Sequence, residues 1–288
     1  MKILVTGKSG QVGYELMRSL QPLGEVVGID QDEMDMGDLD QVRDAIRRIQ
    51  PGLIVNPAAY TAVDKAETEP ELAMRVNALA PAVMAEEAAK LGAAIVHYST
   101  DYVFDGTKPE PYTEADTPCP LNVYGRTKLA GEQAIAAAGV PYLIFRTSWV
   151  YGMRGKNFLL TMMKLAAERE ELRIVADQHG APTWCRTLAD TTASILAQAR
   201  GAGDRDAWWR ENSGLYHLTS QGATTWHGFA DAMLDKAEKK PKLVAISSSE
   251  YPVPAARPTN SRLSCELMIN RFGHLPHWRE ALRLCQEA

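Results

Sequence analysis

Short apolar segments alternate with longer amphipathic stretches over the first half of the 288-residue chain. A strand buried on both faces of a parallel sheet has a nearly continuous apolar sequence, whereas a covering helix is apolar on one face only. The alternation therefore predicts an α/β fold with a Rossmann-like, doubly wound parallel sheet. The expected strands are residues 2–6, 25–29, 53–55, 93–98 and 142–146, and the expected helices follow residue 13 and cover 39–49, about 71–91 and 124–138.

This alternation weakens after Ser148, where a smaller C-terminal lobe is expected. The elements expected there are helices at 158–169, 187–199, 226–239 and 277–285, strands at 173–175 and 215–218, and a surface excursion at 201–212. We expect a dinucleotide-binding domain of residues 1–148, to which segments at about 172–176 and 184–219 return. The substrate-binding lobe is expected to comprise about 149–171, 177–183 and 220–288.

Composition narrows the class of protein. The chain is 45% hydrophobic and 23% charged, which is typical of a soluble globular protein. Its net charge of -5 argues against the basic surface that nucleic-acid-binding proteins usually carry. Four widely spaced cysteines indicate reduced thiols in a cytoplasmic protein rather than a disulfide or zinc framework. The first residues run directly into a strand and no long apolar span follows, so neither secretion nor membrane insertion is expected.

Glycines at positions 7, 10 and 13 follow the first expected strand and open the first helix. Their spacing differs from G-x-G-x-x-G, but glycine here also lets the backbone approach a pyrophosphate, which a helix N-terminus attracts. A purely structural turn is the alternative, and the strand–turn–helix context favours nucleotide binding.

Asp30 ends the second expected strand, where an acid can accept hydrogen bonds from the adenosine ribose. A carboxylate there repels a 2′-phosphate and favours NADH, whereas Lys8 in the glycine turn can offset that repulsion. The choice between NADH and NADPH therefore stays open. A solvated loop acid is the alternative role for Asp30.

Polar residues also follow the third and fourth expected strands, at 56–61 and at Ser99-Thr100-Asp101. Tyr124 and Lys128 lie one helical turn apart, so a phenol and an ammonium would be neighbours. A nearby cation lowers the pKa of a phenol, which makes the pair a candidate acid/base device for a carbonyl or an alcohol. Such a pair also occurs by chance on exposed helices, and a hydroxyl at position 100 can simply cap a helix.

Taken together, Thr6-Gly7-x-x-Gly10-x-x-Gly13, an upstream Thr100 and Tyr124-x-x-x-Lys128 resemble the extended short-chain dehydrogenase/reductases. Further blocks narrow the resemblance, over essentially the whole chain, to the dTDP-4-dehydrorhamnose reductase family. These blocks are residues 56–67, 97–106, 124–132, 145–151, 177–183 and 256–263. One departure is Pro57, where that family more often has Ala.

The resemblance implies an NAD(P)H-dependent oxidoreductase of dTDP-rhamnose and polysaccharide biosynthesis. It would reduce the C4 ketone of the nucleotide sugar dTDP-4-dehydro-L-rhamnose to dTDP-L-rhamnose, the last step of the pathway. Tyr124 would protonate the developing alkoxide, Lys128 would bind the nicotinamide ribose and lower the pKa of Tyr124, and Thr100 would orient the carbonyl oxygen.

The resemblance also implies two sets of binding residues. The cofactor-binding residues would be Gly7, Gly10, Gln11, Val12, Gly13, Asp30, Asp38, Leu39, Ala59, Tyr60, Thr61, Tyr98, Tyr124 and Lys128. The substrate-binding residues would be Thr100, Asp101, Trp149, Asn157, Arg257 and Arg262. A core aromatic and surface arginines are the alternatives for Trp149 and for the two arginines.

Some relatives hold Mg²⁺ at a dimer contact, which implies Glu15 as a metal ligand and a homodimer; a first-turn helix acid, however, needs no metal. Two other functions stay open. A nucleotide-sugar epimerase or dehydratase would recycle bound NAD, although Tyr102 stands where dehydratases typically carry Glu. A non-catalytic nucleotide-binding regulatory subunit would need none of the catalytic residues, all of which are intact. The base of the sugar nucleotide is open as well.

Overall fold

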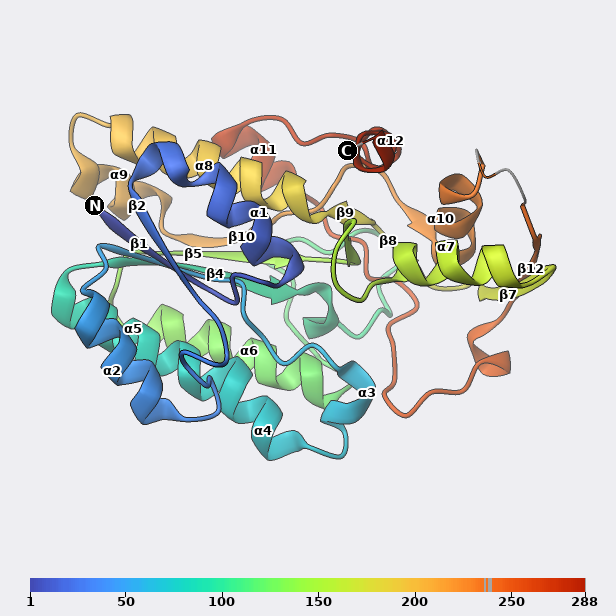
Figure 1. Cartoon of the computed structure of the whole chain (residues 1–288), viewed down its shortest axis with the longest axis horizontal. Helices are drawn as coiled ribbons and strands as arrows, with labels where there is room; N and C mark the ends of the chain where they lie inside the picture. The colour runs from blue at the N-terminus through green and yellow to red at the C-terminus, as the bar shows by residue number, and fades with distance from the viewer. Residues whose placement is uncertain (236, 238–239, 288) are drawn as a thin grey trace.

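A six-stranded parallel sheet forms the centre of the molecule in the computed structural model, which describes residues 1–235, 237 and 240–287 (Figure 1). The strand order is β10-β5-β4-β3-β1-β2. The chain winds from β1 to β2 on one side and then crosses to β3 on the other, as the doubly wound prediction requires. The strands are β1 (Lys2–Thr6), β2 (Glu25–Ile29), β3 (Leu53–Asn56), β4 (Ala94–Thr100), β5 (Tyr142–Thr147) and β10 (Gly214–His217).

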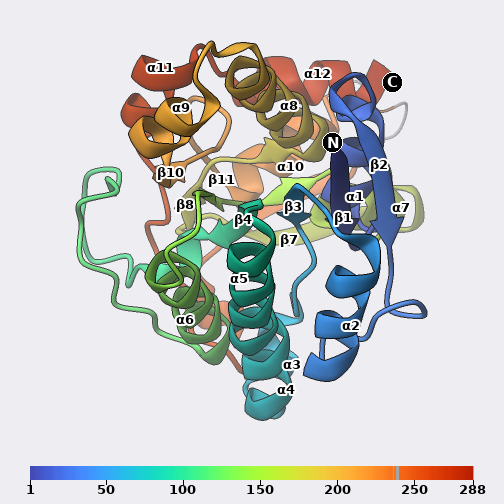
Figure 2. The same ribbon diagram turned by 90° about the vertical axis from the view of Figure 1, so that its left-hand side faces the viewer.

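Helices cover both faces of this sheet (Figure 2). Because side chains alternate along a strand, Ile3 and Val5 of β1 join the core on one face and Leu4 joins the core on the other. The first face is covered by α1 (Gln11–Ser19), α8 (Cys185–Gly201), α9 (Arg205–Asn212) and α11 (Glu266–Phe272), and the second by α2 (Leu39–Ile49), α5 (Ala80–Leu91) and α6 (Val123–Ala137).

The predicted elements of the first half are confirmed with small changes of bounds. Strand β2 and helix α2 coincide with the expected ranges, and β4 runs on to Thr100. The expected helix at 71–91 is helical throughout, but it consists of α4 (Pro70–Met74), a π-helical turn η2 (Arg75–Leu79) and α5. The π-helical turn carries the buried side chain of Asn77.

The smaller lobe lies beyond the carboxyl ends of the sheet strands (Figure 1). Its core gathers apolar side chains from α7 (Phe158–Glu168), β7 (Glu171–Val175), α10 (Trp226–Met233) and α12 (Trp278–Glu287). The prediction that residues 172–176 return to the dinucleotide-binding domain is wrong. Strand β7 instead pairs in parallel with β12 (Lys242–Ile246), a strand that the sequence analysis missed. Its Leu172 and Ile174 side chains pack in the core of the smaller lobe. The expected strand at 215–218 does join the main sheet, as β10 beside β5.

Two expectations for the later part of the chain need correction. Residues 201–212 are not only a surface excursion, because Trp209 of α9 is buried in the core against the sheet. The helix expected at 226–239 ends at Met233, and residues 236, 238 and 239 lie outside the described part. The remaining short elements are η1 (Gln21–Leu23), α3 (Val63–Ala66), η3 (Asp101–Val103), β6 (Val150–Tyr151), β8 (His179–Gly180), β9 (Thr183–Trp184), β11 (Thr224–Thr225) and η4 (Ser248–Glu250). Over the described residues, no helix combines the length and apolarity that crossing a membrane requires.

Candidate active site

A glycine turn joins β1 to α1 at the carboxyl edge of the sheet. Gly7 has φ 61°, which disfavours other residues, and the Gly10 N–H donates to the Gly7 carbonyl at 3.0 Å. A Cβ on Gly13 would collide with that same carbonyl oxygen. Gly10 is the N-cap of α1 and brings no side chain to its first N–H groups, which stay available to a ligand. This cradle fits the pyrophosphate of a dinucleotide.

The residues that follow β2 lie against this turn. The Ser9 N–H donates to the two carboxylate oxygens of Asp30 at 3.1 and 3.4 Å. The Lys8 ammonium forms an ion pair with Glu33, whose Oε2 also accepts from the Asp30 N–H at 3.2 Å. The structure therefore brings Asp30 to the glycine turn, as the ribose-binding role requires.

Strand β4 ends at Thr100, and Asp101 follows as the first residue of η3; both are almost fully buried. The Thr100 hydroxyl donates to Asp101 Oδ1 at 3.0 Å and accepts from the Tyr102 N–H at 3.2 Å, so it also caps η3. Burial raises the pKa of Asp101 to about 7, although hydrogen bonds from the Ser261 and Thr100 side chains lower it. Near neutral pH this carboxyl group therefore exists in both protonation states.

Tyr124 stands in the first turn of α6, which the Asn122 side chain caps by accepting from the Gly125 N–H at 2.8 Å. A Cβ on Gly125 would collide with the Tyr102 carbonyl oxygen, so only glycine lets the helix start this close to η3. The Tyr124 and Tyr102 rings meet edge to face, with centroids 6.0 Å apart. Helix α6 is thereby fixed against the segment that carries Thr100.

The pKa of Tyr124 is raised to about 12, which corrects the expectation that it is lowered. Burial is the largest cause; the hydrogen bond with Thr100 lowers the pKa and the Asp101 charge raises it. The phenol is therefore protonated at neutral pH, as a proton donor must be.

Lys128 is 1% exposed, and its ammonium lies inside the site. Its Nζ donates to the Tyr98 carbonyl at 2.6 Å and lies 3.2 Å from His97 Nε2. Burial lowers the pKa of Lys128 to about 8, against the opposing effect of Glu132. The structure thus places Lys128 one turn below Tyr124 and against the strand that ends in Thr100.

His97 and Asn56 are positioning residues. The sequence analysis placed Asn56 at the end of the third expected strand without this role and gave His97 none. His97 Nδ1 lies 3.0 Å from Asn56 Nδ2, and Asn56 Oδ1 accepts from the Thr6 hydroxyl at 2.6 Å. This buried chain links β1, β3 and β4 to Lys128. Burial and then the Lys128 charge lower the pKa of His97 well below its usual value, so the ring is neutral. The available signal was a histidine inside an otherwise apolar strand.

A buried ion pair lies one further turn along α6. Arg146 of β5 binds Glu132 with two hydrogen bonds, at 2.9 Å from Nε and 2.6 Å from Nη2. The Ser99 hydroxyl, next to Thr100, also donates to Glu132. The Glu132 carboxylate therefore joins α6, β4 and β5. The candidate catalytic residues lie on the first two of these elements, and β5 is the neighbour of β4 in the sheet.

The segment after β3 is held by Asn77 of the π-helical turn. Asn77 Oδ1 accepts from the Tyr60 N–H at 2.8 Å, and its Nδ2 donates to the Tyr60 carbonyl and to the Thr127 hydroxyl, each at 3.1 Å. Tyr60, which stands between the predicted cofactor-lining residues Ala59 and Thr61, is thus tied through Asn77 to Thr127 of α6, the neighbour of Lys128.

Trp149 faces the smaller lobe from the end of β5. Its φ of 47° is unusual for a bulky residue, and its ring stacks on Trp226 with centroids 3.7 Å apart and planes inclined by 10°. Trp226 is held in turn by a 3.1 Å hydrogen bond from its Nε1 to Gln178 Oε1. Strained backbone such as that of Trp149 clusters at ligand and active sites, which favours the predicted role of Trp149. The sequence analysis gave Trp226 no role at this site.

The other predicted substrate residues lie in three places. Arg257 pairs with Asp64 of α3 through hydrogen bonds of 2.9 and 2.8 Å, and it also neighbours Tyr102. Asn157 donates to Gln11 Oε1 at 2.8 Å, which brings it to the glycine turn. Arg262 donates to Asn260 Oδ1 at 2.8 Å and to the Pro109 carbonyl.

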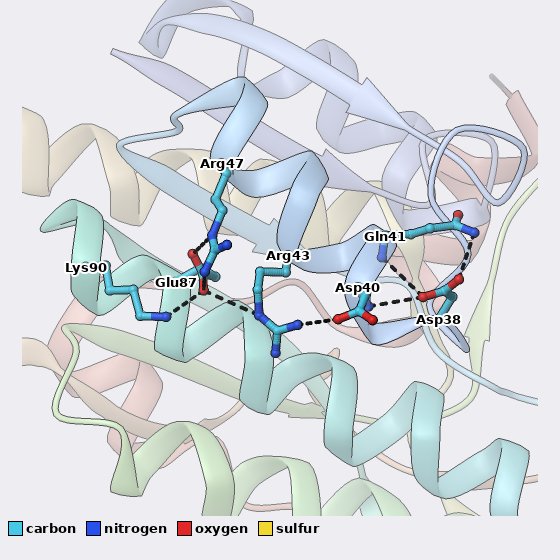
Figure 3. Close-up of polar contacts among 7 residues, drawn as sticks. All are labelled: Asp38, Asp40, Gln41, Arg43, Arg47, Glu87 and Lys90. Carbon is cyan, nitrogen blue, oxygen red and sulfur yellow. Dashed lines mark hydrogen bonds and ion pairs between the residues drawn. The ribbon is translucent and has the colours of Figure 1, made fainter.

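Asp38 is the N-cap of α2, and Leu39 is the first residue of that helix. Figure 3 shows Asp38 as the N-cap, accepting from the Asp40 and Gln41 N–H groups at 3.1 and 3.2 Å. It also shows the Glu87 carboxylate gathering Arg47, Arg43 and Lys90, which fixes α2 on α5. The capping role explains Asp38 without a ligand; contact with adenine stays a prediction.

The Mg²⁺ expected at Glu15 gains no support from a single chain. Among residues 1–235, 237 and 240–287, no group of three or more His, Cys, Asp or Glu side chains is arranged to hold a metal ion. Glu15 lies near Cys185 and Cys285, whose thiol pKa values are raised mainly by burial. The four cysteines are free thiols.

The Asp101 carboxyl group should make stability depend on pH. Its pKa of about 7 in the folded chain lies above the ordinary ~3.9 of an unfolded chain, so the folded state binds the proton more tightly. Its contribution is then complete below pH ~4 and is lost as the pH rises towards 7. We expect the free energy of unfolding of the natural chain, relative to Asp101→Asn, to fall between pH 4.5 and 7.5 in urea titrations.

Asp116→Asn is the matched control for this measurement. The Asp116 pKa is held at about 2 by Lys108, so its contribution is constant above pH ~5. The difference in free energy of unfolding between the natural chain and Asp116→Asn should therefore not change above this pH. The prediction would be contradicted if the difference between the natural chain and Asp101→Asn were also independent of pH.

Comparison with known proteins places this geometry in a family. A family model described as "RmlD substrate binding domain" matches residues 1–288. The chain is 52% identical to a dTDP-4-dehydrorhamnose reductase of Burkholderia thailandensis, over 99% of this chain and 98% of the relative. It is 47% identical to a protein of the same name from Salmonella typhimurium, over 96% of this chain and 94% of the relative.

Solved structures agree with these relatives. A dTDP-4-dehydrorhamnose reductase from Bacillus anthracis in complex with NADP is 35% identical, with a TM-score of 0.89 over 99% of this chain and 98% of that one. The ortholog from Clostridium acetobutylicum is 36% identical, with a TM-score of 0.92 over 100% and 99%. A UDP-glucose 4-epimerase from Thermus thermophilus is only 21% identical at a TM-score of 0.81, a likeness that shows the fold alone.

Proposed function

This chain belongs to the dTDP-4-dehydrorhamnose reductase family, and on that premise we propose that it reduces the C4 ketone of dTDP-4-dehydro-L-rhamnose to dTDP-L-rhamnose. One observation carries the proposal at the level of residues. Tyr124 of α6 neighbours Thr100 at the end of β4, and Lys128, one turn further along α6, bonds the Tyr98 carbonyl of the same strand. The glycine turn follows β1 at the same carboxyl edge of the sheet. The reaction is the last step of dTDP-rhamnose biosynthesis.

NADH or NADPH, when bound, supplies the hydride. Tyr124 donates a proton to the developing alkoxide oxygen, and its pKa of about 12 keeps that proton in place until the oxygen becomes basic enough to take it. Thr100, whose hydroxyl bonds both Tyr124 and Asp101, orients the carbonyl oxygen. Lys128 holds the ribose next to the nicotinamide, and its buried positive charge stabilises a negative oxygen nearby.

The remaining predicted residues are proposed to bind rather than to react. Those proposed to line the coenzyme are Gly7, Gly10, Gln11, Val12, Gly13, Asp30, Asp38, Leu39, Ala59, Tyr60, Thr61 and Tyr98. Those proposed to hold the nucleotide sugar are Asp101, Trp149, Asn157, Arg257 and Arg262. The lobe formed by about 149–171, 177–183 and 220–288, now joined by β7, is proposed as the substrate-binding unit. We propose the cytoplasm as its place of action, and a homodimer stays a prediction.

An absorbance assay tests the function directly. Purified protein is mixed with dTDP-4-dehydrorhamnose and either NADH or NADPH, and absorbance at the reduced-nicotinamide band is followed. We expect stoichiometric oxidation of added coenzyme and formation of dTDP-rhamnose. A protein that arrives with NAD bound and converts a nucleotide sugar without consuming added coenzyme would instead be an epimerase or dehydratase.

A further inference from the structure

Lys8 places a positive charge beside the expected position of the adenosine ribose. Its backbone N–H donates to the Ile29 carbonyl at 3.3 Å, and the next residue, Ser9, donates to Asp30. Gly28 of β2 makes room for it, because a Cβ there would be 2.9 Å from the Lys8 Cβ. An acid at this strand end receives the ribose 2′-hydroxyl in dinucleotide-binding folds, so Lys8 stands near the 2′ position.

The Lys8 ammonium is paired with the Glu33 carboxylate in this structure. The two side chains form an ion pair and are 37% and 42% exposed, so the pair is open to an incoming ligand. The Glu33 Oε2 atom also accepts from the Asp30 N–H at 3.2 Å, which fixes the carboxylate on the strand end. The positive charge that could attract a phosphate is therefore balanced before any coenzyme binds.

We propose that Glu33 sets the choice between NADH and NADPH by holding Lys8 back from the 2′-phosphate. The inference rests on the proposed function only in that the chain binds a nicotinamide dinucleotide. NADH leaves the Lys8–Glu33 pair intact, because its 2′-hydroxyl can donate to Asp30. NADPH has to draw Lys8 away from Glu33 and to place its phosphate near two carboxylates, those of Asp30 and Glu33.

Removing the Glu33 charge should therefore favour NADPH selectively. Glu33→Gln keeps an oxygen that can accept from the Asp30 N–H, yet it frees Lys8 for the phosphate. We expect the ratio of the dissociation constants, Kd for NADPH over Kd for NADH, to fall about tenfold, the order of one unit-charge interaction at ~4 Å in a well-solvated site. Lys8→Met should raise the same ratio, since the phosphate then meets carboxylates alone.

Fluorescence titration of the purified protein with NADH and NADPH measures both constants without the ketosugar. Asp32→Asn is the matched control: it removes the same unit of charge from an exposed neighbour of Glu33. It should change the ratio less than about twofold, because screening weakens exposed charges that make no direct contact. The Glu33→Gln effect should also shrink as salt is raised.

The double variant Lys8→Met/Glu33→Gln gives the decisive comparison. Beside Lys8→Met, Glu33→Gln can relieve only the direct repulsion between the Glu33 carboxylate and the phosphate. If Glu33 acts mainly through Lys8, this substitution should therefore lower the ratio clearly less there than in the natural chain. An effect of Glu33→Gln that equals that of Asp32→Asn, or that persists undiminished beside Lys8→Met, would overturn the inference alone. Failure of the natural chain to bind either coenzyme would overturn the proposed function, and this inference with it.

Discussion

Tyr124→Phe should lower kcat by about 10²- to 10⁴-fold, the usual contribution of one positioned proton donor. The substitution removes only the phenol oxygen, so the ring stays in its edge-to-face contact with Tyr102. Coenzyme affinity should change less than about threefold, since the glycine cradle and Lys128 remain. Turnover is measured by coenzyme oxidation with the ketosugar, and affinity by fluorescence titration.

Tyr251→Phe is the control for this prediction. It removes the same oxygen from a tyrosine of the smaller lobe that is 60% exposed, and kcat should not change. Oxidation of coenzyme by Tyr124→Phe at the rate of the natural chain would refute the proton-donor role. A variant that loses coenzyme binding as well as turnover would instead show that Tyr124 holds the site together.

Arg146→Met should cost about 3–5 kcal/mol of stability, because it leaves the buried Glu132 carboxylate without its cation. Both side chains are only 4% exposed, so water cannot replace the lost partner. Ser99 would remain as a donor to Glu132, but one hydroxyl does not balance a full charge. Urea unfolding followed by tryptophan fluorescence measures the free energy of unfolding of both proteins.

Two further variants show whether the unpaired charge of Glu132 causes the loss of stability in Arg146→Met. Arg173→Met breaks an ion pair with Glu250 whose side chains are 57% and 47% exposed, and it should cost less than about 1 kcal/mol. Glu132→Gln added to Arg146→Met removes the unpaired charge and should recover part of the loss. Equal losses for Arg146→Met and Arg173→Met would rule out a special role for the buried pair.

The main sheet could be predicted because its signals are local. A continuous apolar run such as residues 3–5 of β1, followed by Gly7, indicates both a buried strand and the turn after it without reference to any distant residue. The carboxyl ends of parallel strands share one edge, so the meeting of Thr100 with the Tyr124 helix also followed from topology.

The smaller lobe and the environment of the site residues could not be predicted in the same way, because they depend on contacts between segments far apart in the sequence. Strand β7 alternates charged and apolar residues, as a strand with one exposed face does, but this pattern does not identify β12 as its partner. His97 acts through Asn56 and Lys128, which lie on two other elements. The direction of the Tyr124 pKa shift was missed because desolvation of the phenol depends on everything packed around it.

The pairing of β7 with β12 has a consequence for synthesis on the ribosome. Glu171 and its partner Lys242 are 71 residues apart, so at ~5–20 residues per second β7 waits about 4 to 14 seconds for the strand beside it. An unpaired strand edge invites association with other chains. The exposed charges of Glu171 and Arg173 on this strand guard against such association while the nascent chain is incomplete.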